Sequence, residues 1–175
     1  FLIIGNMNAI TYKEIFPLIK ENKIWLGVSS GARTYTTIDG GTQKMGNTCW
    51  YTDLDNGHRH TPLQLMTMED NIMYSRHKEI KGIGYKHYSN YDAIEVPYAD
   101  AIPSDYNGTM GVPISFLDKY CPEQFEIIGQ TQGDSGKELG LIPFDRELKK
   151  LNKSLRDGQL YYMEDGIPQK PYARI

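Results

Sequence analysis

The stretch FLIIGNMNAITYKEIFPLIKENKIWLGV, residues 1–28, decides the fold class. FLIIG at 1–5 is a short continuous apolar run, typical of a strand covered on both faces, and IWLGV at 24–28 resembles the next strand. A T-x-x-E capping box beginning at Thr11 predicts a helix start, whereas Pro17 favours a later start because proline is tolerated only in a first turn. Strand, short helix and strand in this order predict an α/β unit.

The residues after Val28 predict one more strand and leave its connection to IWLGV open. Residues 29–47 are rich in Ser, Thr and Gly, and TCWYTDL at 48–54 has the composition of a strand. Two strands either flank a polar loop here or form a small hairpin around Asp39-Gly40. Further along we expect a strand at 91–96, a buried strand at 125–129, a short polar helix over 145–156, and a closing hairpin around Asp165-Gly166.

The bulk composition is that of a globular domain. Of the 175 residues 39% are hydrophobic and 23% are charged, and no apolar run approaches the roughly 20 residues that span a bilayer. Without a visible signal peptide we expect a cytoplasmic protein with no membrane partner. Cys49 and Cys121 lie outside any zinc-binding spacing, and His58 and His60 have no third ligand nearby, so we expect no metal.

The two ends of the chain are unusual. Phe1 opens directly into an apolar strand, and the chain stops at ARI, within what resembles another strand. A natural polypeptide seldom begins inside a core strand, so we predict a piece of a longer protein.

A basic and aromatic stretch at 74–91 is the strongest candidate binding site. It holds four Lys or Arg residues against one Glu, with four tyrosines between them, in a chain whose net charge is −3. Cations neutralise phosphates and aromatic rings stack on bases, so the pattern favours a nucleic-acid contact; the alternative is a solvated face. The candidate phosphate contacts are Arg76, Lys78, Lys81 and Lys86, with His58, Arg59 and His60 as secondary candidates.

Two asparagines follow the first strand. Asn6 and Asn8 lie where α/β sheets present ligand-binding groups, at the carboxyl end of a strand. The alternative is an asparagine turn that caps the following helix. None of the general motifs for nucleotide binding, metalloprotease or serine-hydrolase chemistry is present, so the residues alone assign no catalytic group.

Long blocks of the chain resemble one family, the EcoRI-type adenine-specific modification methyltransferases. The resemblance covers nearly the whole chain in the family's order. Its blocks are FLIIGNMNAITYKEIFPLIKENKIWLG at 1–27, GNTCWYTDLD at 46–55, NYDAIEV at 90–96, YNGTMGVPISFLDKYCPEQFEIIG at 106–129, and the closing YARI.

The resemblance implies an α/β fold: residues 1–55 are the C-terminal half of a Rossmann-like methyltransferase core, and residues 56–175 are a mixed α+β extension that recognises the DNA target. It also implies methyl transfer from S-adenosylmethionine to the N6 atom of adenine in a specific sequence of double-stranded DNA. IWLGV and TCWYTDL then form the antiparallel hairpin that ends the sheet.

The family's glycine-containing cofactor loop and Asn-Pro-Pro-Phe tetrad are absent from this sequence. The resemblance therefore implies that the intact parent protein binds the cofactor, that this piece is inactive alone, and that none of its residues is catalytic. Asn6 and Asn8 remain pocket-lining candidates, and Tyr35, Trp50 and Tyr51 are candidates for the aromatic wall around an extruded base. The alternatives are a non-catalytic, sequence-specific DNA-binding module and a protein-interaction domain.

Overall fold

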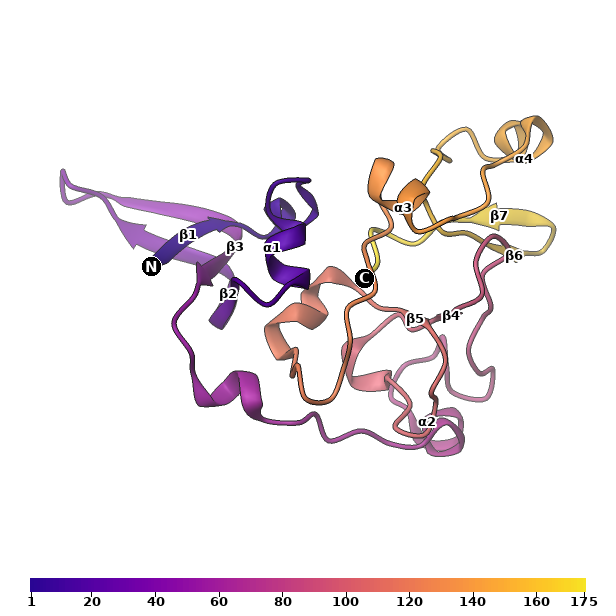
Figure 1. Cartoon of the computed structure of the whole chain (residues 1–175), viewed down its shortest axis with the longest axis horizontal. Coiled ribbons are helices and arrows are strands. Elements are labelled where there is room, and N and C mark those ends of the chain that lie inside the picture. The colour runs from indigo at the N-terminus through magenta and orange to yellow at the C-terminus, as the bar shows by residue number, and fades with distance from the viewer. The chain divides into compact units, whose positions relative to one another are not determined.

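The computed structural model describes all residues from Phe1 to Ile175 and divides into two compact units. Unit 1 comprises Phe1–Pro62 and Leu117–Glu126, and unit 2 comprises Leu63–Phe116 and Ile127–Ile175. Small sheets, short α-helices and 3-10 helices alternate along the chain (Figure 1), so the mixed α/β class is confirmed. A Rossmann-like core stays a prediction.

Unit 1 is built on a three-stranded antiparallel sheet in the order β1-β3-β2, with β1 at Leu2–Asn6, β2 at Trp25–Thr36 and β3 at Thr42–Thr52. The hairpin alternative is therefore confirmed, but its strands are long and run through the polar stretch that could have been a loop. Thr and Tyr fit a pleated ladder well, and each strand satisfies the backbone groups of the other. Gly40, at φ 81°, supplies the left-handed residue of the turn.

The helix of unit 1 begins later than the capping box predicts. Met7–Thr11 forms the 3-10 helix η1, and the hydroxyl of Thr11 donates to the carbonyl of Asn8, at the end of that turn. The α-helix α1 spans Phe16–Lys20 and has Pro17 in its first turn, as the proline predicts. The capping-box prediction is wrong because the asparagine before η1 starts a helical turn earlier in the chain.

The first strand is an edge strand. Leu2 and Ile3 are 55% and 57% exposed, and β1 pairs only with β3. The buried face of unit 1 lies under η1 and α1 instead. It is formed by Met7, Ile10, Phe16, Ile19, Ile24, Leu26, Cys49 and Tyr51.

Unit 2 contains two small sheets and several short helices. Its 3-10 helix η3 spans Ala99–Ala101, and a further one, η4 at Ile114–Lys119, crosses into unit 1. The parallel pair is β4 at Ile94–Glu95 and β5 at Met110–Gly111, and the closing hairpin is β6 at Tyr162–Glu164 with β7 at Ile167–Gln169. The α-helices are α2 at Met68–Tyr74, α3 at Asp134–Glu138 and α4 at Arg146–Leu151.

The closing hairpin is confirmed, with Asp165 and Gly166 both at positive φ, and α4 confirms the polar helix in a shorter form. The strand expected at 91–96 shortens to β4. The strand expected at 125–129 is wrong. Ile127 is buried but Ile128 is 45% exposed, because no neighbouring strand pairs with this apolar run.

A buried ion pair organises the centre of unit 2. Arg174 Nη2 lies 2.5 Å from Glu95 Oε1, and the two side chains are only 10% and 8% exposed. The hydroxyl of Tyr88 donates to the other oxygen of Glu95, and the backbone N–H of Arg174 donates to Thr131. The closing segment of the chain is therefore fixed to β4 by charge, and its backbone hydrogen bonds join it to Val112 and Thr131.

The structural division does not follow the expected one at residue 55. The break falls between Pro62 and Leu63, and the segment 117–126 returns to unit 1. Sequence position could not indicate this return, because it depends on hydrogen bonds between groups about 60 residues apart. The functional division into a core part, 1–55, and a recognition part, 56–175, stays a prediction.

Candidate functional site

The two asparagines after β1 lie in a network of amides. The side chain of Asn6 accepts a hydrogen bond from the Asn8 N–H at 2.8 Å and so caps η1. The side chain of Asn8 accepts from Asn47 Nδ2 at 3.4 Å, and the Tyr51 hydroxyl donates to the carbonyl of Asn6 at 2.9 Å. The capping turn, which was the alternative interpretation, is therefore present. A pocket-lining role for these residues stays a prediction.

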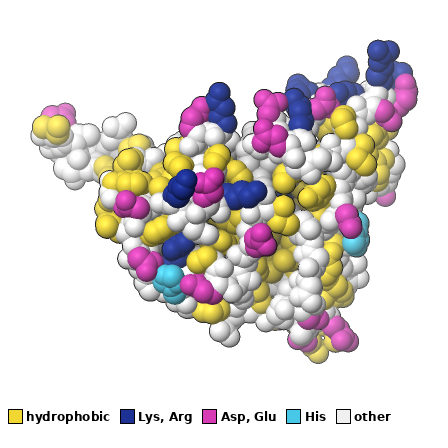
Figure 2. All heavy atoms as spheres, in the orientation of Figure 1, with side chains coloured by type: hydrophobic (Ala, Val, Ile, Leu, Met, Phe, Trp, Pro, Cys, Tyr) yellow, Lys and Arg dark blue, Asp and Glu magenta, His cyan; other side chains and the backbone are white.

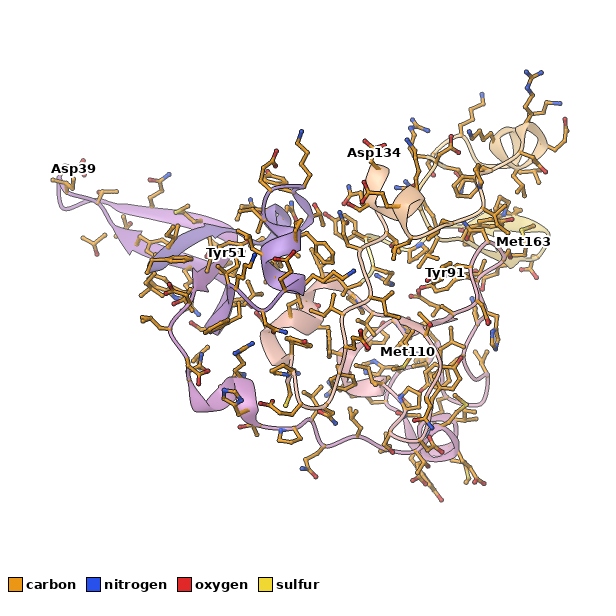
Figure 3. The ribbon with its side chains drawn as sticks, viewed as in Figure 1. Asp39, Tyr51, Tyr91, Met110, Asp134 and Met163 are labelled. Atoms are coloured by element: carbon orange, nitrogen blue, oxygen red, sulfur yellow. The ribbon has the colours of Figure 1, made fainter.

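The three aromatic candidates lie on two faces of the sheet. Tyr51 is on the buried face, and its ring lies so close to Gly5 that a Cβ there would come within 2.9 Å of it. Burial raises the pKa of Tyr51, so its hydroxyl stays a neutral donor. Figure 3 labels this residue near the base of the hairpin. Tyr51 thus supports the end of β1 from within the core.

Trp50 lies on the opposite face, because successive strand residues alternate. Thr48 is on the same face as Trp50, and its hydroxyl lies 3.4 Å from that of Tyr35. Asn6 is directly paired with Thr48 in the antiparallel register and so shares this face. The register therefore places four residues, Asn6, Tyr35, Thr48 and Trp50, on one face of the sheet, and we call them the sheet-face cluster.

Arg59 is held inside unit 1. Its guanidinium lies 3.9 Å from the centroid of the Trp25 ring and donates to Asn22 at 2.7 Å, and its side chain is only 12% exposed. The planar guanidinium stacks on the indole ring and donates a directional hydrogen bond, while its buried Nε has no hydrogen-bond partner. This geometry gives Arg59 a structural role; its expected contact with a phosphate stays untested.

The neighbouring histidines attach the segment 117–126. His60 contacts Glu123 through Nδ1 at 2.6 Å and Asp55 through Nε2 at 2.8 Å. His58 Nε2 lies 3.1 Å from the carbonyl oxygen of Asp118. Both imidazoles therefore make internal contacts that a bound phosphate would have to replace.

The His60 bridge predicts a pH-dependent stability. Hydrogen bonds that the His60 ring donates to Glu123 and then to Asp55 raise the pKa of His60 above 6.5. Its contribution is therefore complete below that pH and is lost as the pH rises through the raised value. His60 in turn lowers the pKa of Glu123 from 4.5 to about 2, so that contribution is lost on acidification. We therefore expect the bridge to stabilise unit 1 most between pH 4.5 and 6.5.

The measurement is the thermal midpoint of wild type and His60→Gln across pH. The difference between them should be largest in this window and should shrink towards alkaline pH. His87→Gln is the control, because the side chain of His87 is exposed and the histidines that contact a carboxylate are His60 and His77. A constant difference at every pH would show that the imidazole does not titrate between the two carboxylates.

Two of the four cations in 74–91 are paired with acids. Arg76 Nη2 lies 2.7 Å from Asp100 Oδ2. Lys86 Nζ lies 2.5 Å from Glu164 Oε1 and 4.6 Å from the centroid of the Tyr162 ring. Lys78 and Lys81 are exposed and have no acidic partner. These two lysines are the stronger candidates for a phosphate contact, since no carboxylate must be displaced.

Several residues with well-defined contacts in the structure escaped the sequence analysis. Asn90 is buried and donates to the carbonyls of Ile142 and Gln159, while Glu95 binds Arg174. Asn90 and Glu95 lie in NYDAIEV, and Arg174 lies in YARI. Two of the blocks that carry the resemblance therefore contain residues that hold the fold of unit 2 together. The sequence feature that could have indicated these contacts is a charged or amide residue beside apolar residues, because such a residue is buried only when it is paired.

The residues of this chain do not form a complete binding site for S-adenosylmethionine, the cofactor that the resemblance implies. The amides of Asn6 and Asn8 are already engaged with the backbone and with Asn47, and the chain contains no glycine-rich phosphate or nucleoside loop. No three His, Cys, Asp or Glu side chains are grouped as metal ligands, and none of the helices is long and apolar enough to cross a bilayer.

Comparison with known proteins identifies the family. The family model described as adenine-specific methyltransferase EcoRI matches residues 1–175. The type II methyltransferase M.EcoRI of Escherichia coli is 43% identical over 176 residues, which cover 89% of this chain and 51% of that protein. M.MgeORF184P of Mycoplasma genitalium and M.MpnI of Mycoplasma pneumoniae, also type II methyltransferases, are each 33% identical over 146 residues, covering 73% of this chain and 43% of theirs.

No solved structure matches the chain significantly. The chain spans about half the length of the curated relatives that it matches. The family model covers every residue of the chain, including the four blocks and the closing YARI. The chain belongs to the EcoRI family of adenine-specific methyltransferases.

Proposed function

We propose that the protein containing this chain transfers a methyl group from S-adenosylmethionine to the N6 atom of adenine in a specific duplex sequence, as the modification enzyme of a restriction-modification system. The observation that carries the proposal is the match of the adenine-specific family model to residues 1–175. The sheet order β1-β3-β2 supports it, because the antiparallel hairpin lies beside β1 as the resemblance implies.

In this proposal the chain supplies part of the catalytic core and the DNA-recognition region. Residues 1–55 complete the core sheet, and residues 56–175 recognise the target. The sheet-face cluster contributes to the wall around an extruded adenine, since an unstacked base needs new stacking partners. The cofactor loop and the residues that hold the adenine amino group belong to other parts of the full-length protein.

The test is methyl transfer by the full-length protein. Purified enzyme is incubated with unmethylated genomic DNA and labelled S-adenosylmethionine, and the digested nucleosides are separated by mass spectrometry. We expect label in N6-methyladenine and none in methylated cytosine. Sequence-specific binding without any methyl transfer would overturn the proposal in favour of a non-catalytic DNA-binding module. The isolated chain is expected to transfer no methyl group.

The lysines of 74–91 give a second test. Substitution of Lys78 and Lys81 by alanine in the full-length protein should weaken DNA binding and flatten the slope of log affinity against log salt by about two units, because each phosphate contact contributes about one. Sequence preference should change little. Fluorescence anisotropy with target and scrambled duplexes over a range of salt concentrations measures both quantities.

Lys149 and Lys150 in α4 provide the matched control. They belong to the same unit and carry the same charge, but they pair with Asp157 and Glu147. Their replacement by alanine should leave the salt slope unchanged. If both double variants behave alike, 74–91 is an ordinary solvated face.

A further inference from the structure

The outer part of the β2–β3 hairpin, residues 31–47, is a two-stranded ribbon without a third strand. β1 pairs with β3 only from Thr48 to Thr52, so beyond Thr48 the two long strands pair only with each other. All residues from Thr42 to Asn47 are exposed, and Ile38 in the turn is 109% exposed. The hairpin runs past β1 in Figure 1 to a free end, where Figure 3 labels Asp39.

The ribbon carries hydrogen-bonding groups on both faces. One face holds Arg33, Tyr35, Gln43 and Met45, and the other holds Thr34, Thr36, Thr42 and Lys44, as the cross-strand register places them. Neither Arg33 nor Lys44 has an acidic partner. In the space-filling view of Figure 2 the projecting hairpin is largely white, the colour of polar side chains and backbone.

The single carboxylate of the ribbon is turned back on the loop. A hydrogen bond from the Thr37 hydroxyl and others from the backbone, including that of Gly41, lower the pKa of Asp39. The carboxylate is therefore ionised but occupied by the turn. The ribbon as a whole presents two unpaired cations, several hydroxyl and amide groups, and only two exposed large apolar side chains, Ile38 and Met45.

Such a ribbon contributes little to the stability of unit 1. Two strands without a third strand or a covering helix are marginally stable in water, so this one depends on the sheet for its own order. A partner protein would favour a contiguous apolar patch, which the ribbon lacks. Its cations and hydrogen-bonding groups instead complement a surface that carries negative charge together with donors and acceptors.

We propose that the ribbon, residues 31–47, enters the major groove of the DNA duplex, a role that rests on the proposed function. The groove is about 12 Å wide and about 8.5 Å deep and admits a two-stranded β-ribbon, whose strands lie about 4.8 Å apart. Arg33 lies three residues behind Thr36, about 10 Å along a strand that rises about 3.4 Å per residue. When the turn reaches the base edges, Arg33 and Lys44 thus lie level with the phosphates.

The outer residues then face the bases. Thr36, Thr42 and Gln43 have the hydroxyl and amide groups that read base edges, and the side chain of Ile38 fits the methyl group of thymine. The ribbon therefore divides into a base-reading turn, residues 36–43, and a phosphate-binding pair, Arg33 and Lys44. The two parts predict different effects of substitution.

The experiment uses the full-length protein and a 30-base-pair duplex, a length of about three helical turns, that carries the site methylated by the wild type. Arg33→Ala with Lys44→Ala should lower affinity for target and scrambled duplex alike, by about 10-fold or more, and reduce the salt slope by about two. Thr36→Ala with Gln43→Ala should reduce the ratio of target to scrambled affinity by about 10-fold. The charge control is Lys13→Ala with Lys23→Ala, two exposed lysines elsewhere in unit 1.

Methyl transfer by the wild type in the same samples separates the two proposals. If the wild type transfers no methyl group to adenine, the proposed function fails. If it does, and the ribbon variants bind and methylate like the Lys13, Lys23 control, the ribbon inference alone is overturned. A change in oligomeric state on sedimentation, with DNA affinity unchanged, would likewise overturn it and make the ribbon a protein contact.

Discussion

Replacement of Glu95 by alanine is expected to lower the free energy of unfolding of unit 2 by about 3–5 kcal/mol, the cost of leaving a buried charge without its partner. Arg174 is the charge left behind, since it binds both oxygens of Glu95 and its side chain is 10% exposed. Tyr88 would lose the acceptor of its hydroxyl in the same variant. Because a domain of this size is stable by only about 5–15 kcal/mol, the variant should unfold at much lower urea concentration.

Urea denaturation followed by far-ultraviolet circular dichroism measures this loss. The matched control is Glu164→Ala, since Glu164 is about half exposed and its pair with Lys86 is worth at most about 1 kcal/mol. Adding Arg174→Ala to Glu95→Ala should recover part of the loss, because the second change removes the unpaired charge. Equal effects of the Glu95 and Glu164 variants would contradict the buried-pair interpretation.

Replacement of Tyr35 by alanine in the full-length protein is expected to reduce the efficiency of adenine methylation by about 10- to 100-fold. Stacking of a base on an aromatic side chain is worth about 1–3 kcal/mol, and that interaction is lost with the ring. Tyr35 is half-buried and lies in the sheet-face cluster near Thr48. Tyr35→Phe keeps the ring and should retain activity within about 3-fold, because the hydroxyl contact of 3.4 Å is long.

Initial rates of methyl transfer to the target duplex measure the effect, and Tyr12→Ala is the control for loss of an exposed tyrosine in the same unit. Fluorescence of 2-aminopurine placed at the target adenine adds a readout of base extrusion. We expect less extrusion of the target base in Tyr35→Ala than in the wild type. Extrusion in Tyr35→Phe should equal that of the wild type. Full activity of Tyr35→Ala would remove the residue from the wall around the base.

The local elements with strong chain signals were predictable. Pro17 marks the first turn of α1 because its missing N–H costs nothing there, and Asp165-Gly166 marks the closing turn because both residues tolerate positive φ. The hairpin of β2 and β3 was one of two open alternatives. Its full length was not predictable, since a polar Ser-, Thr- and Gly-rich stretch suits both a loop and an exposed ladder.

The candidate site was predictable only in part. The sequence indicated Asn6, Tyr35 and Trp50 separately, but their common face follows from the register of three strands. Tyr51, one position along from Trp50, lies on the buried face because side chains alternate. The charge pattern of 74–91 likewise did not distinguish the paired Lys86 from the unpaired Lys81, since Glu164 is far away in sequence.

By itself the sequence determined the α/β class, the positions of the tight turns and, through long blocks matched in order, the family. The turns and the fold class depend on local backbone preferences, and the family depends on the order of residues along the chain. Neither is altered by contacts with residues that are distant in sequence. Only the tertiary structure decided that the edge strand β1 is exposed, that Glu95 and Arg174 form a buried pair, and that residues 117–126 return to unit 1. Each of these depends on contacts between groups about 50 to 80 residues apart, and their free energy is set by burial and geometry that arise only when the chain has folded.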